Sequence, residues 1–176
     1  MRSLNKRIFT IAFTIILIFA LSGVVSAKKA VEYPFGFTHG MSQEEALGNL
    51  DEIGANVTRT SSSTILADYS HIFDGINVQT IYLRFFDGKL NRVALDSDGV
   101  NTSDEHLLRL QSVSDHLKSE YKVFRISNNI PVNDETDLKK RYLCRYQDST
   151  FEILIYSYYE NGQYFMSLNF VKIFAH

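Results

Sequence analysis

Residues 141–173 read RYLCRYQDSTFEILIYSYYENGQYFMSLNFVKI, and this stretch decides the fold. Apolar residues alternate along it with the period of two that is typical of β-strands. If Asn161-Gly162 forms a two-residue turn, Ile155 lies opposite Leu168 and one face becomes almost entirely apolar. The other pairs expected in this register are Tyr159 with Tyr164, Ser157 with Met166, and Ile153 with Phe170.

A third strand precedes these two if Asp148-Ser149 forms another short turn. That turn sets Arg145 opposite Glu152, so charge pairing and apolar pairing agree in one register. The apolar pairs expected there are Tyr146 with Phe151, Cys144 with Ile153, and Tyr142 with Ile155. We therefore predict a three-stranded antiparallel meander, with Cys144 as a buried, unreactive thiol on its core face.

Upstream, residues 79–86 and 89–97 flank Asp87-Gly88, which is a strong hairpin signal because glycine adopts positive φ without strain. Strict two-residue closure sets Leu83 opposite Arg92. A slip of one residue instead pairs Leu83 with Val93 and Ile81 with Leu95. We expect a β-bulge in this hairpin.

Two helices are predicted by their N-terminal caps. Ser42 and Glu45 form a capping box before a helix over about 43–53, and Gly54 can end it. A second box over 102–105 precedes a longer helix, in which one apolar stripe comprises Leu107, Leu110, Val113, Leu117 and Tyr121. Residues 58–63 and 127–137 are polar and predict connections.

These elements predict an α+β fold, an antiparallel sheet with two helices packed on one face. The order helix, strands, helix, strands also allows two tandem halves, about 33–98 and 99–176.

The N-terminus has the pattern of an export signal. Three cations in the first seven residues precede an apolar run over 8–21, and Val25-Ser26-Ala27 supplies small residues for cleavage after Ala27. Residues 1–27 are then a signal peptide and 28–176 a single domain in the periplasm or outside the cell. The alternative is an uncleaved signal anchor, because the apolar run approaches the length of a membrane span.

Composition restricts the partners. Removing residues 1–27 leaves 15 cations against 20 acids, a formal charge of −5. An acidic surface argues against a nucleic acid as partner, and after signal cleavage it also argues against a membrane. Nucleic acids and anionic membranes both bind clusters of Lys and Arg. A single cysteine cannot form an intramolecular disulfide, so the core must provide the stability.

Few residues suggest catalysis or metal binding, and we expect no cofactor and no metal. Residues 96–105 are acidic, but Gly99 is misplaced for an EF-hand, which favours a turn before a capped helix. No two of the histidines have metal-ligand spacing, and we expect surface or loop positions for His39, His71, His106, His116 and His176. The alternative function is a small periplasmic hydrolase assembled only in three dimensions, with His71 and Asp68, or His39, as first candidates.

One feature points to binding: the second face of the predicted meander is too apolar for contact with water alone. Its residues are Leu143, Leu154, Tyr156, Tyr158 and Phe165. Either a helix or the segment 33–37 covers this face, or it binds a partner, which would be another envelope protein or a small ligand. We therefore expect a non-enzymatic binding protein.

The segment Gly40-Met41-Ser42-Gln43-Glu44-Glu45, with Gly54 after the helix, resembles the helix start of β-lactamase-inhibitor-like and outer-membrane-assembly small lipoprotein domains of bacteria. The resemblance covers about 15 residues. It implies a helix followed by antiparallel strands and a protein-binding role in the cell envelope. This chain differs in having neither a lipobox cysteine nor a cysteine pair.

Overall fold

The computed structural model describes residues 28, 31–121, 125–128, 141–147 and 150–173, of which 125–128 and 141–147 are described by their backbone alone. The predicted signal peptide lies outside these residues. The elements are α2 (Gln43–Glu52), β1 (Asn56–Thr60), β2 (Thr64–Phe73), β3 (Ile76–Phe86), β4 (Lys89–Ser97), α3 (Ser103–Glu120), β5 (Arg125–Asn128), β6 (Arg141–Gln147), β7 (Phe151–Glu160) and β8 (Gln163–Lys172). No helix of the described residues is long and apolar enough to cross a membrane.

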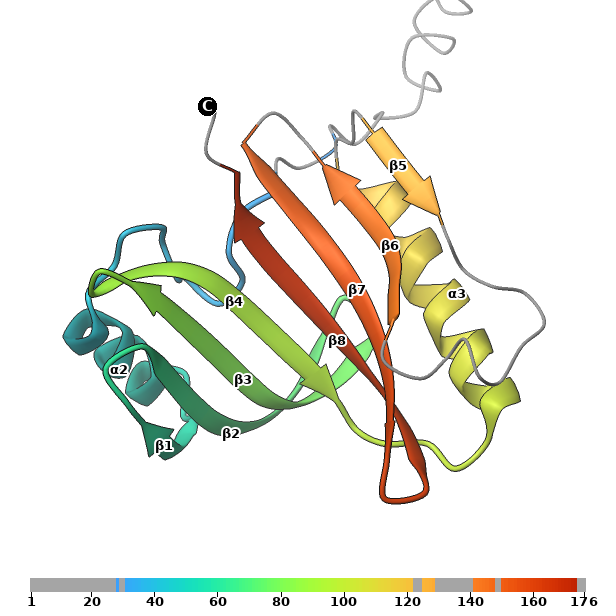
Figure 1. The fold of residues 1–176 in the computed structure, drawn as a ribbon, viewed down its shortest axis with the longest axis horizontal. Helices are drawn as coiled ribbons and strands as arrows, with labels where there is room; N and C mark the ends of the chain where they lie inside the picture. Colours follow the sequence, from blue (N-terminus) through green and yellow to red (C-terminus); the bar gives the residue numbers. More distant parts are fainter. Residues whose placement is uncertain (1–27, 29–30, 122–124, 129–140, 148–149, 174–176) are drawn as a thin grey trace, which may run out of the picture.

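All the named strands belong to one sheet, in the order β1-β2-β3-β4-β8-β7-β6-β5, and every neighbouring pair is antiparallel. Each half of the chain contributes a helix followed by four strands, and the halves join where β4 pairs with β8 (Figure 1). Both helices lie behind the sheet in the view of Figure 1. The predicted α+β class, an antiparallel sheet with two helices on one face, is confirmed.

A single hydrophobic core fills the space between the sheet and the helices. Residues of β4 that face this core, such as Leu95, pair with Leu168 of β8, which faces it as well. Leu50 of α2 and Leu110 of α3 belong to the same cluster of buried residues. Tyr33 joins this core too, so the N-terminal segment packs on the helix side and does not cover the opposite face.

The predicted caps and turns are present, but the second of the two capping boxes forms only in part. The Ser42 hydroxyl accepts from the Glu45 amide while the Glu45 carboxylate accepts from the Ser42 amide, and Gly54 follows the helix with φ of 76°. Thr102 caps α3 through the Glu105 amide, whereas the Glu105 carboxylate lies 3.9 Å from the Arg109 guanidinium and no return bond to Thr102 is described. These local hydrogen bonds satisfy backbone groups that would otherwise lack partners at a helix end.

The register predictions are confirmed at two hairpins. Strands β7 and β8 pair around Asn161-Gly162 as expected, with Ile155 opposite Leu168. Strands β3 and β4 pair Leu83 with Val93, and the predicted bulge lies between Arg84 and Phe85.

The register predicted for β6 and β7 is wrong by two residues. Cys144 pairs with Ile155 rather than Ile153, and Arg145 pairs with Leu154 rather than Glu152. A shift of two returns each residue to the same face, so apolar alternation cannot distinguish the two registers. Tyr142 pairs with Tyr156 rather than Ile155, because a second irregularity interrupts the ladder between Tyr142 and Cys144.

Three strands are absent from the prediction. Residues 58–60, expected in a connection, belong to β1, and 127–128 belong to β5. Strand β2 was not predicted at all. Every residue of β1 is exposed, so this edge strand has no apolar alternation to detect.

Candidate functional site

The face of the sheet opposite the helices is called the open face here. Its part on strands β4, β8 and β7 is formed by alternate residues, which are Ala94 and Asp96 of β4, Phe165, Ser167 and Asn169 of β8, and Leu154, Tyr156 and Tyr158 of β7. Within the described part of the chain, no helix lies over this face (Figure 1). Sheets of this kind normally place polar residues on such a face.

Aromatic and apolar side chains occupy one half of the open face. Tyr158 and Phe165 lie directly opposite each other, with ring centroids 5.2 Å apart and planes inclined by 11°. Tyr156 and Leu154 continue the same strand, the first half-buried and the second buried. The structure therefore brings together four of the five residues that the sequence predicted as a partner surface.

The fifth predicted residue, Leu143, cannot be placed in the same way. It lies in β6 at the register irregularity between Tyr142 and Cys144, and the side chains of that strand are outside the described residues. The same limit applies to the prediction that the Cys144 thiol is buried.

Gly99 supports the stacked ring pair from the side. A Cβ atom at this position would lie 2.8 Å from Cε1 of Phe165 and 2.8 Å from Oε1 of Gln163. Only a residue without a side chain lets the loop after β4 approach the ring so closely. The orientation of Phe165 thus depends on a glycine in the acidic stretch 96–105.

A polar group that was not predicted from the sequence lies at the centre of the open face. Asp96 pairs with Ser167 across β4 and β8, and their side chains are hydrogen-bonded. The Asn169 side-chain amide donates to the Ser167 hydroxyl at 3.0 Å. Burial raises the pKa of Asp96, and the Ser167 hydrogen bond only partly opposes this shift.

Asp96 also affects the aromatic half of the face. Burial raises the pKa of Tyr158 most strongly, and the negative charges of Asp96 and Glu160 raise it further. A tyrosine with a raised pKa remains a neutral phenol, which can donate one hydrogen bond. The open face therefore combines aromatic and apolar side chains with a carboxylate and hydrogen-bonding groups.

The prediction that all five histidines are at surface or loop positions is wrong for His106. Its ring is buried in the first turn of α3, with Nε2 2.6 Å from Oγ of Ser157 and a stacked contact with Tyr164. Burial, and then the nearby positive charge of Arg109, lower the pKa of His106 to about 4. Ser157 is fully buried as well, so this histidine–serine pair stabilises the interior and cannot meet a substrate.

The histidine–carboxylate pair suggested for a hydrolase is not formed. Asp68 pairs with Thr80, next to Asp96 on the open-face side. His71 instead stacks on the Tyr69 ring and meets the Phe35 ring edge to face, on the helix side. The two candidates lie on opposite faces of β2 and cannot act together.

A histidine–carboxylate contact that the sequence did not predict joins the two halves. The His116 ring Nε2 lies 3.3 Å from Oδ1 of Asp74, and the Tyr121 hydroxyl donates to Oδ2 of Asp74 at 2.9 Å. Asp74 is at the β2–β3 turn, whereas His116 and Tyr121 are at the end of α3. This cluster holds the hairpin against the helix.

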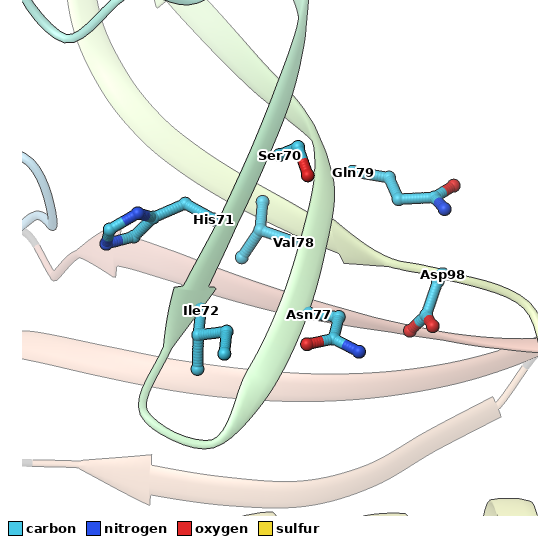
Figure 2. Close-up of a pocket in the computed structure, with 7 residues that line it drawn as sticks. All are labelled: Ser70, His71, Ile72, Asn77, Val78, Gln79 and Asp98. Atoms are coloured by element: carbon cyan, nitrogen blue, oxygen red, sulfur yellow. The ribbon is translucent and has the colours of Figure 1, made fainter.

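A polar hollow of about 530 Å³ lies beside that hairpin. Figure 2 shows the side chains of Asn77, Gln79 and Asp98 on one side of it and the His71 ring pointing away from them. The Asp98 carboxylate is bound by Arg109. The hollow can hydrogen-bond a small polar molecule, but its histidine is not directed at its carboxylate.

Among the described residues, no group of three or more His, Cys, Asp or Glu side chains is arranged to hold a metal ion. Comparisons with protein-family models, with curated proteins and with solved structures found no match to this chain.

Proposed function

We propose that this chain is an exported, non-enzymatic binding protein that engages a protein partner through its open face. The observation that supports this most is the aromatic half of that face, Leu154, Tyr156, Tyr158 and Phe165, with no described helix over it. Tyrosine and phenylalanine are enriched at protein interfaces because they supply large rigid area with few rotatable bonds. An uncovered sheet face suits a protein better than a small ligand, which favours an enclosed cavity.

Replacing Tyr156, Tyr158 and Phe165 together by alanine should weaken capture of the partner from an envelope extract more than about tenfold, because central aromatic residues each contribute about 2 kcal/mol at interfaces. The measurement is a pull-down with quantitative mass spectrometry, accompanied by circular dichroism of the variant. The matched control replaces Ile72, Phe86 and Leu108, which are exposed apolar residues outside the aromatic half of the open face. Equal capture by the native chain and the open-face variant would refute the surface assignment.

Export is the second part of the proposal and has its own test. The charged start, apolar run and small residues before Lys28 support cleavage after Ala27. Mass spectrometry of the protein recovered from its host should find an N-terminus at Lys28. A chain that retains Met1 would instead support the membrane-anchored alternative.

A further inference from the structure

Asp96 has an unusual position for a carboxylate. It lies in the middle strands of the sheet, between Thr80 of β3 and Ser167 of β8, and its side chain is largely buried. Burial of a charge is costly unless hydrogen bonds or an opposite charge compensate for it. The contact described for its carboxylate is the Ser167 side chain.

Some of the other carboxylates of the described residues have cationic partners. Arg109 binds Asp98, and Lys118 lies 3.3 Å from Asp115. For Asp96, by contrast, no Lys or Arg among the described residues lies within ion-pair distance. The Ser167 hydroxyl accepts from Asn169 and has a single proton to donate, so it can compensate only part of the negative charge of Asp96.

The surroundings of Asp96 fit one kind of cation in particular. Its charge acts on Tyr158, whose ring is stacked nearly parallel on Phe165. An arginine guanidinium is planar, stacks on aromatic rings, and donates hydrogen bonds to a carboxylate at the same time. A lysine ammonium is more strongly hydrated and lacks the planar shape.

We infer that Asp96, with the Tyr158–Phe165 ring pair beside it, receives an arginine side chain presented by the protein partner. This inference rests on the proposed function, because it names the chemistry that the open face recognises. The bound guanidinium would compensate for the buried charge of Asp96 and select the ionised carboxylate. The predicted charge of −5 on the exported chain would also favour approach of a basic partner.

The test uses a defined probe, the peptide acetyl-Phe-Arg-Phe-amide, and a control peptide with citrulline, which is the neutral isostere of arginine. Amide shifts in ¹⁵N nuclear magnetic resonance spectra locate the binding site and yield dissociation constants at millimolar peptide. We expect the arginine peptide to shift β4 and β8 and to bind roughly tenfold more tightly than the citrulline peptide.

Two variants complete the experiment. Asp96→Asn should fold, since it is nearly isosteric and removes a buried charge, and it should reduce the arginine preference to less than about twofold. Asp51→Asn, which changes an exposed carboxylate on α2, should preserve the preference.

The outcomes separate this inference from the proposed function. Equal binding of the two peptides on β7 and β8 would overturn the arginine site, while supporting an apolar binding face. Failure of the arginine peptide to bind, or binding away from Asp96, would overturn the inference too, and the pull-down would then test the open face independently.

Discussion

Phe170→Ala is expected to lower the free energy of unfolding by about 3–5 kcal/mol, because removing a large buried side chain loses its transfer energy and leaves a cavity. Phe170 is fully buried in β8. It pairs with Val93 of β4 and Ile153 of β7, and its ring meets Phe73 edge to face at 5.9 Å. It therefore lies at the junction of the two halves.

Urea unfolding, followed by circular dichroism, measures this effect. The matched control is Phe86→Ala in β3, because Phe86 is 68% exposed and the chemical change is the same. That control should change the free energy of unfolding by less than about 0.5 kcal/mol. Similar losses in the two variants would contradict the position of Phe170 in the core.

The shape of the transition is equally informative. Because β4 pairs with β8 and one core runs through both halves, we expect a single cooperative transition in the native chain and in Phe170→Ala. Two separated transitions in Phe170→Ala would mean that the halves are coupled mainly through this one side chain.

The sequence predicts those parts of the fold in which nearby residues determine the result. Asn161-Gly162 defines a tight turn, so all neighbouring pairs of β7 and β8 follow from it. Ser42 with Glu45, and Thr102 with Glu105, form their hydrogen bonds within one helical turn. Such features need no information from distant residues.

Features that depend on distant or irregular contacts were predicted less well. Strand β2 carries a register shift between Asp68 and His71, which disturbs its pairing with β3. The turn between β6 and β7 lacks a glycine, so its length was not fixed by residue type. The apolar pattern alone then allowed two registers that differ by two residues.

The candidate site was predicted only in part, because some of its contacts are local along the chain and others are not. Tyr158 and Phe165 are joined by one hairpin, and alternation was enough to place them on one face. Asp96 and Ser167 are brought together only by the pairing of β4 with β8, 71 residues apart along the chain. No local pattern distinguishes Asp96 from the exposed acids that follow it.

His106 shows a signal that could have been used. It precedes Leu110 by four residues, which places it on the same helical stripe as the core of α3. The partner that accounts for its burial, Ser157, is 51 residues away on β7. A histidine whose spacing along a helix matches that of the buried apolar residues should therefore be predicted as buried.

The second large effect concerns pH and this histidine. The pKa of His106 is about 4 in the folded chain and 6.5 in the unfolded chain. Between these values the unfolded chain binds a proton that the folded chain does not, so acidification favours unfolding. Above about pH 6.5 the neutral His106 contributes fully to the free energy of unfolding. This contribution is lost as the pH falls toward 4. The expected loss is about 3 kcal/mol.

Unfolding free energies of the native chain and His106→Gln, measured from pH 7.5 to pH 4, test this expectation. Other groups titrate in both proteins, so the difference between the two curves isolates His106. The native curve should fall more steeply, because glutamine can hydrogen-bond Ser157 without titrating. His71→Gln, which removes an exposed histidine, should follow the native curve.

Ser157→Ala distinguishes the cause of the pKa shift. Burial is the largest cause, and the charge of Arg109 the second, so losing the Ser157 hydroxyl should lower stability at all pH values and keep most of the slope. If Ser157→Ala flattened the curve as much as His106→Gln, the hydrogen bond rather than burial would keep His106 neutral. In either case the pH dependence of the free energy of unfolding tests whether His106, in the first turn of α3, stays buried against Ser157 of β7.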